Sequence, residues 1–386
     1  MAFATIDLTK GITGVLPSAN ATYSTPRKNA EPIIQNGDMA VAQRSTSVTG
    51  ITSDGYKLCD RWYEYLSSLG TYTFTQEAQT SGNAFNNGFR TAFRIDCTTA
   101  DGSPSASDEF WWGIKLEGRD LQMFKKGSSN AEKFTLAFWV KSNKTGTGQV
   151  NFRDTDNSRM CSGTYTISSA DTWEHKIINI AADTTGAFTN DNAESLQIQW
   201  YLDSGSNYEG GTAPTAWESD SATDRNAAGT LNIGDNTAND WSITGVQLEV
   251  GEFTSATLPP FQHESFGDNL LRCERYYQTI CEGTDKPFGM GQYWEAQEFI
   301  GHRVLPTTMR TAPTLEYVSG TNYYAILRDG GSNQFSGLTI SSSPKTGNMI
   351  TWYLGSGQGI ASNTKNRPGF MRTQSTSSKI AMSSEL

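Results

Sequence analysis

The chain has 386 residues, a length that suggests two or three domains of ordinary size. Only 36% of the residues are hydrophobic and 18% are charged, which excludes a coiled coil and charge-driven disorder, while 11% aromatic residues indicate a folded chain. A net charge of −10 argues against nucleic acid as a partner, and no apolar run approaches the roughly 20 residues that a membrane span needs. Met1–Lys10 lack a secretory-signal pattern, so Sec-dependent secretion is not expected.

Residues 1–32 are rich in Gly, Thr, Ser, Ala and Asn and contain three prolines, which is typical of an arm or linker. The segment Gly11–Pro17 (GITGVLP) is apolar but too short for a core of its own. It could dock on another surface, and a disordered terminus is the alternative interpretation.

Short segments with β-type residues recur from Ile33 to about residue 255, separated by turn residues. Several alternate between apolar and polar residues, as strands with one buried face do. The clearest are Gly70–Thr75, Phe134–Val140, His175–Ile180, Leu196–Leu202 and Trp241–Val250. Because no amphipathic helices are interleaved, residues 33–255 are predicted to form a two-sheet jelly-roll sandwich of about ten strands in an all-β protein.

Residues 256–282 are predicted to form a helical connector, with the helix over Ser265–Ile280 and Ser265 or Asp268 as its N-cap. Residues 283–386 are predicted to form a second, small β domain. A domain of about 100 residues with few large apolar residues per strand has a marginal core, so self-association is expected to supply the missing burial. Its strands are expected at Glu298–Gly301, Thr314–Val318, Tyr323–Leu327, Leu338–Ile340, Met349–Leu354 and Lys379–Met382.

Motifs of metal or nucleophilic catalysis are missing from the sequence. The three histidines lack zinc-site spacing, and Gly289–Gly291 and Gly355–Gly359 are predicted to be turns rather than nucleotide-binding loops. The five cysteines are far apart and are predicted to be reduced and buried. No cofactor is expected. A structural calcium ion is a further hypothesis, with ligands from Asn36, Asp38 or Glu249.

Paired carboxylates are the one catalytic arrangement that the sequence leaves open, because a polysaccharide depolymerase needs only two acids across a cleft. Asp60, Glu117 and Glu218 stand near tryptophans, although a structural or solvated role is the favoured interpretation for each. An enzyme is therefore not predicted.

Aromatic residues provide the candidate carbohydrate-binding site, since aromatic faces can stack on sugar rings. In the dipeptide Trp111–Trp112, adjacent side chains of a strand point to opposite faces, so one of the two is expected to leave the core. Tyr208 and Trp217 flank a Gly- and Ser-rich loop at which a ligand could dock. The candidate site is therefore Trp111, Trp112, Tyr208 and Trp217, with packing in the core as the alternative role.

An ordered series of segments resembles a group of bacteriophage tail-fibre and virion-surface proteins, whose first domain is a jelly roll similar to family 4/9 carbohydrate-binding modules. The resemblance covers residues 33 to about 280, and more loosely Val304–Leu315 and Ser384–Leu386. Its strongest segments are Ile33–Arg44 (IIQNGDMAVAQR), Tyr56–Tyr63 (YKLCDRWY), Phe134–Ser142 (FTLAFWVKS), Trp173–Lys176 (WEHK), Trp241–Gly251 (WSITGVQLEVG) and Leu258–Tyr277 (LPPFQHESFGDNLLRCERYY).

The resemblance implies a component of a phage virion, made in the host cytoplasm and assembled as a homotrimer. Residues 1–32 would attach to other tail or capsid proteins, and the β domains would face outward. The function expected is attachment to a host surface polysaccharide without enzymatic activity. Two alternatives stay open: a purely structural tail or head-decoration protein, and a polysaccharide depolymerase. The resemblance transfers no sugar-binding residues, and the chain lacks the long shaft of an extended fibre.

Overall fold

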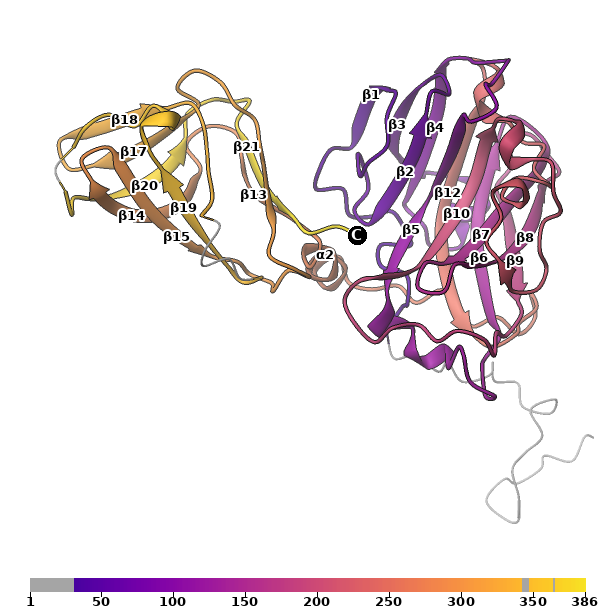
Figure 1. The fold of residues 1–386 in the computed structure, drawn as a ribbon. Coiled ribbons are helices and arrows are strands. Elements are labelled where there is room, and N and C mark those ends of the chain that lie inside the picture. The colour runs from indigo at the N-terminus through magenta and orange to yellow at the C-terminus, as the bar shows by residue number, and fades with distance from the viewer. Residues whose placement is uncertain (1–30, 342–346, 364) are drawn as a thin grey trace, which may run out of the picture.

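The computed structural model describes residues 31–341, 347–363 and 365–386. The predicted arm lies almost entirely outside these residues. Strands dominate the described chain, and the expected all-β architecture is confirmed (Figure 1). In these described segments, no helix is long and apolar enough to cross a membrane.

Two six-stranded antiparallel sheets form a β-sandwich (Figure 1). The first sheet runs in the order β1 (Ser47–Ile51), β3 (Thr71–Ala78), β4 (Thr91–Thr99), β12 (Asp240–Val250), β6 (Phe134–Ser142) and β9 (Glu174–Ile180). The second runs in the order β11 (Glu218–Ser219), β8 (Arg159–Ile167), β7 (Gly146–Asp154), β10 (Glu194–Ser204), β5 (Glu109–Glu117) and β2 (Trp62–Ser67). Short helices lie in the connections: α1 (Gly82–Asn86), η2 (Gly118–Phe124), η3 (Ser206–Tyr208), η4 (Ala222–Asp224) and η5 (Ile233–Asp235).

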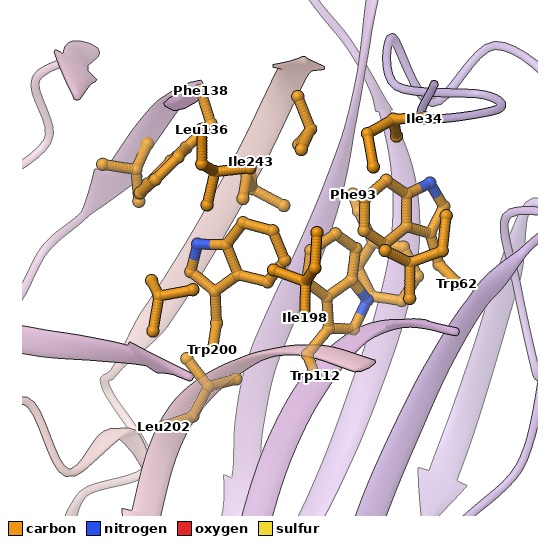
Figure 2. Packing of buried hydrophobic residues seen from close by; sticks show 14 of the residues in the cluster. Ile34, Trp62, Phe93, Trp112, Leu136, Phe138, Ile198, Trp200, Leu202 and Ile243 are labelled. Carbon is orange, nitrogen blue, oxygen red and sulfur yellow. The ribbon is translucent and has the colours of Figure 1, made fainter. Parts of the chain in front are cut away.

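The core of the sandwich is built on large aromatic side chains from both sheets. Trp112 stacks on Trp62 with ring centroids 4.2 Å apart, and the ring of Trp200 lies 5.4 Å from that of Trp112. Phe93, from the opposite sheet, lies 5.2 Å from Trp112 (Figure 2). Each of these side chains removes a large apolar area from water, so this cluster contributes strongly to the stability of the sandwich.

Helix α2 (Phe266–Glu274) is shorter than predicted. Ser265 is its N-cap as expected, with the Ser265 hydroxyl accepting from the Asp268 backbone N–H. The helix ends at Glu274, and Tyr277, which lies within the predicted helix, begins strand β13 instead. The prediction over Ser265–Ile280 was wrong at its end because β-type residues after Arg275 pair with the last strand of the chain.

The C-terminal part contains two further antiparallel sheets. One has the order β13 (Tyr277–Glu282), β21 (Lys379–Ser383) and β16 (Thr314–Tyr317). The other has the order β18 (Gly331–Phe335), β17 (Tyr324–Arg328), β20 (Pro368–Thr373), β14 (Pro287–Glu295), β15 (Glu298–Val304) and β19 (Met349–Leu354), with η6 (Ser356–Gln358) after it. Buried side chains of both sheets, from Ile280 to Met382 in the sequence, form one hydrophobic cluster that is separate from the core of the sandwich. The domain boundaries set from the sequence stay a prediction.

A polar junction ties the C-terminal part to the sandwich. The fully buried Arg61 guanidinium pairs with the Glu385 carboxylate at 2.7 Å and lies 3.4 Å from the centre of the Tyr276 ring. Arg275 donates two hydrogen bonds to Glu117, at 2.8 and 2.7 Å. Buried charges of this kind are stable only when they are paired, so the junction depends on its complete set of partners.

The cysteines agree with the sequence analysis except in the burial of Cys281. All five are free thiols; Cys59, Cys97, Cys161 and Cys273 are buried, and Cys281 is half-buried.

Candidate functional site

The outer face of the sheet that contains β5 carries a row of aromatic side chains. Alternation along β2 and β5 turns Trp62 and Trp112 into the core and turns their neighbours outward. The strand register then places Tyr65, Trp111 and Tyr201 directly opposite one another on β2, β5 and β10. Side chains at such positions are in contact range, so three distant stretches of sequence meet at one place.

Trp111 and two tyrosines form a packed aromatic strip. The Tyr65 ring stacks on the Trp111 ring at 5.7 Å with an interplanar angle of 5°, and the Tyr63 ring lies 5.4 Å from Trp111 at an angle of 41°. Lys115 holds its ammonium group 4.0 Å from the centre of the Tyr63 ring. Because Trp111 is only 5% exposed, the half-buried rings of Tyr63 and Tyr65 provide the open aromatic surface.

Amide side chains continue the same face beyond the aromatic strip. Gln199 lies opposite Asn151, and Tyr201 lies opposite Gln149. The Gln149 amide donates to the Asn151 oxygen at 2.8 Å, and the Gln199 amide donates to the Gln197 oxygen at 2.7 Å. The Gln199 oxygen is buried and has no hydrogen-bond partner among the described residues. Such an acceptor is costly unless a water or a ligand satisfies it.

The connection from β10 to β12 covers part of this face and brings Tyr208 to it. The carbonyl of Arg225 accepts from the Asn151 amide at 2.7 Å, and the Arg225 guanidinium is held by Asp220 at 2.9 Å. Burial, followed by the charge and hydrogen bond of Glu109, raises the pKa of Tyr208 to about 12. The Tyr201 hydroxyl also donates to Glu109, so this carboxylate links Tyr208 to the aromatic row.

The four aromatic residues predicted from the sequence therefore lie in three different places. Trp111 is on the outer face, which confirms that one member of the dipeptide leaves the sandwich core, and Tyr208 borders the same face. Trp112 is completely buried in the core, which excludes it from a surface site, and naming it as a binding residue was wrong. The sequence of a single strand does not reveal whether its odd-numbered or its even-numbered residues face the second sheet.

Trp217 lies at the other edge of the sheet, beside β11. Its indole N–H donates to the Ala181 carbonyl at 2.8 Å, and the Lys126 ammonium lies 4.9 Å from its ring. The ring also packs against Phe134 and the main hydrophobic cluster. These contacts give Trp217 a packing role, and the strand order separates it from Trp111.

The acidic residues noted in the sequence do not join the aromatic strip. Burial raises the pKa of Asp60 to about 6 in spite of the nearby Arg44, and its carboxylate accepts from Gln43. Burial alone would raise the pKa of Glu117, but hydrogen bonds from Arg275 and Tyr276 lower it. Asp60 and Glu117 thus belong to the junction region, while Glu218 is exposed on β11.

The suggested calcium ligands are also occupied by protein contacts. The Asn36 amide donates to the carbonyls of Val41 and Asp60, and Asp38 accepts from Asn269. Within the part of the chain that the structure describes, no three His, Cys, Asp or Glu side chains are grouped to hold a metal ion.

No protein-family model matches the chain, and no curated protein matches it either. Three solved structures illustrate the similarities found. The enzymatically active domain of tailspike protein 4 from bacteriophage CBA120 is 11% identical over 57% of this chain and 21% of its own, with a TM-score of 0.29. A putative sugar-binding protein from Bacteroides thetaiotaomicron is 13% identical over 57% of this chain and 100% of its own, with a TM-score of 0.30. A CBM4 structure is 12% identical over 56% of this chain and 99% of its own, with a TM-score of 0.29. All three similarities are low in both sequence identity and TM-score, and this chain spans only a fifth of the tailspike structure.

Proposed function

We propose that the protein binds a polysaccharide on the outer face of the sheet that contains β5, without cleaving it. The observation that carries this proposal is the packed strip of Tyr63, Trp111 and Tyr65 beside buried amides, one of which has an unpartnered oxygen. Aromatic rings offer apolar faces to sugar C–H groups, and amide and guanidinium groups bond hydroxyls. Rigid packing holds these groups in place before a ligand arrives, which lowers the entropy cost of binding.

The biological setting belongs to the same proposal. The resemblance of residues 33–280 to phage tail-fibre and virion-surface proteins supports a virion component that attaches to a host surface glycan. Weak sugar contacts would suffice in an oligomer, because several sites on one particle raise the effective concentration. Detection of the chain by mass spectrometry in purified phage particles, or its absence from them, tests the location separately from the binding.

The binding test uses the full chain and a panel of bacterial surface polysaccharides, scored for retention and for released oligosaccharide together. Tyr65→Ala and Trp111→Ala are expected to weaken retention about tenfold or more, since a centrally placed aromatic contact often contributes over 1.4 kcal/mol. Trp139→Ala is the matched control, because Trp139 is also half-buried and stacks on His175 at 4.9 Å, but on the opposite sheet.

Each outcome of the panel decides one part of the proposal. Retention by the wild type and by Trp139→Ala, with loss in Tyr65→Ala, supports the site. Equal retention by all variants places the binding elsewhere, and release of oligosaccharide makes the protein an enzyme. If the wild type retains none of the polysaccharides, the result favours a purely structural role.

A further inference from the structure

The six-stranded C-terminal sheet has an apolar outer face that no described element covers. Met290 is 74% exposed, Val304 is 72% exposed and Phe370 is 42% exposed. The strand register joins them into one surface, because Met290 lies opposite Phe370, and Phe370 lies opposite Leu327. The other face of this sheet packs inward through residues such as Trp352 and Met371, so the exposed row is a second, separate apolar surface.

Met290 and Phe370 form a ridge between two grooves. The first groove has a volume of about 810 Å³ and continues over Leu327 and Pro368. The second has a volume of about 540 Å³ and continues over Pro287 and Val304. A sugar would find few hydrogen-bonding groups here, and a small apolar ligand prefers an enclosed cavity. A projecting ridge with a groove on each side fits a second surface of similar shape.

The charged residues at this face bear on whether two copies of the chain could associate through it. The chain as a whole carries −10, so two acidic surfaces would repel each other. The first groove instead contains one charge of each sign, Arg328 and Asp329, whereas the second contains two basic side chains, His302 and Arg303. In a symmetric contact, the Arg328 of one copy can therefore face the Asp329 of the next without net repulsion.

Geometry gives the same partner. Two apolar sheet faces pack about 10 Å apart in a β-sandwich, with their side chains interdigitated. Soluble monomers rarely expose contiguous apolar patches larger than a few hundred Å², and larger ones mark association sites. The C-terminal cluster is much smaller than that of the sandwich, so burial of a second face would also add to its stability.

We propose that the outer face of the sheet β18–β17–β20–β14–β15–β19 packs against the same face of a second copy of this chain. Such a two-fold contact gives a dimer, in place of the homotrimer that the resemblance implies. This contact is independent of polysaccharide binding. The face lies on a different sheet from the aromatic strip, so association through it would leave Tyr65 and Trp111 open. Association would then present several binding faces on one assembly.

The test measures the mass of the full-length protein in solution by light scattering over a range of concentrations. The wild type is expected to be a dimer, and Met290→Glu combined with Phe370→Ser is expected to shift it to monomer by at least a tenfold rise in dissociation constant. Phe266→Glu combined with Leu271→Glu is the matched control, because these α2 side chains are 61% and 50% exposed but lie outside the face. The control is expected to keep the wild-type mass.

Cross-linking keeps the proposal testable if the double variant folds poorly. Met290→Cys is expected to give covalent dimers with a short bis-maleimide, whereas Leu271→Cys is not, and four of the five natural cysteines are buried. A wild type that is monomeric at the highest attainable concentration overturns the proposal. So does an oligomer that survives Met290→Glu with Phe370→Ser, or cross-linking at Leu271→Cys alone.

Discussion

The sandwich sheet that contains β5 and the six-stranded C-terminal sheet differ in the composition of their outer faces. Both pack one sheet face into a core, but the outer face around Trp111 pairs aromatic rings with amides, whereas the outer face around Met290 exposes apolar side chains with few polar neighbours. The first pattern suits a ligand with both C–H and hydroxyl groups. The second suits another protein surface. The difference in composition between these two outer sheet faces therefore underlies the two proposals made for this chain.

The junction between these regions differs from both faces, because it is made of buried charges rather than apolar contacts. Arg61, Glu117 and Glu385 meet partners from the other region. Such pairs add little net stability over apolar packing, but they are strongly directional. We infer that they set the geometry of the two regions, while each hydrophobic cluster stabilises its own sheets.

The largest change in unfolding free energy is expected from replacing the adjacent tryptophans. Comparing Trp112 with Trp111 tests how much more the inner face of the sheet contributes to stability than the outer face. Trp112→Ala should lower the free energy of unfolding by about 3–5 kcal/mol, because it leaves a cavity beside Trp62 and Phe93. Trp111→Ala should cost less, about 1.5–3 kcal/mol, since it loses the burial of a side chain on the outer face but leaves no cavity between the two sheets. Urea unfolding followed by circular dichroism measures both. Equal losses would show that Trp111 belongs to a core of its own.

The second prediction concerns the junction. Arg61→Met should cost about 3 kcal/mol, because it leaves the Glu385 carboxylate with only its longer, 3.2 Å pair to Arg44 and removes the donor from the Lys115 carbonyl. Lys365→Met is the control: the Lys365 pair with Glu295 has a similar distance of 2.6 Å, but both side chains are more than half exposed. That loss should stay within about 0.5 kcal/mol. Limited proteolysis near α2 should cleave the Arg61→Met variant faster than the Lys365→Met variant. A similar loss of unfolding free energy in both variants would show that the buried pair contributes no more than the exposed one.

These two predictions also show what the sequence could and could not supply. Trp111 and Trp112 were correctly assigned to opposite faces, because the period of two is local. The aromatic row was not found, since Tyr65, Trp111 and Tyr201 come together only through the pairing of β5 with β2 and with β10, which are distant in the sequence. The alternation in Trp62–Ser67 (WYEYLS) was the one local signal for Tyr63 and Tyr65.

The C-terminal sheets were predicted less completely than the sandwich. Gly289–Gly291 was expected to be a turn, yet it lies within β14, where side chains of Met371 and Trp352 pack on Gly289. A Cβ on Gly291 would lie 1.9 Å from the Ile300 carbonyl oxygen, so glycine permits the close approach of β15. From the sequence alone, a glycine can indicate either a turn or a close approach of two strands, and the two roles cannot be told apart. Gly355–Gly359, by contrast, is the predicted turn.

A third prediction uses a buried carboxyl group in the sandwich. Glu64 is fully buried, and neither of its carboxyl oxygens has a hydrogen-bond partner among the described residues. Burial raises its pKa well above the ordinary value, so the folded state binds its proton more tightly than the unfolded state. The stability that the protonated group permits is complete below about pH 4 and is lost as the pH rises toward the folded-state pKa.

Glu64→Gln should therefore match the wild type near pH 4 and exceed its stability by about 1 kcal/mol or more at pH 8. Asp60 and Asp203, whose pKa values burial raises to about 6 and about 7, contribute the same trend to both proteins and cancel in the difference. Thermal unfolding at a series of pH values measures it, with Glu295→Gln at an exposed position as control. A difference independent of pH would mean that Glu64 is ionised in the fold.

The smallest effect is expected on the apolar face, and it returns to the contrast between the two outer faces. Met290→Gln should change the unfolding free energy of the dilute monomer by less than about 0.5 kcal/mol, because an exposed side chain has little packing to lose. Tyr65→Ser should cost about 0.5–1.5 kcal/mol through its stack on Trp111. Urea unfolding below the association range compares the two. A cost for Met290→Gln as large as that for Tyr65→Ser would place Met290 in the intramolecular packing, and the face would then not be available to a second copy.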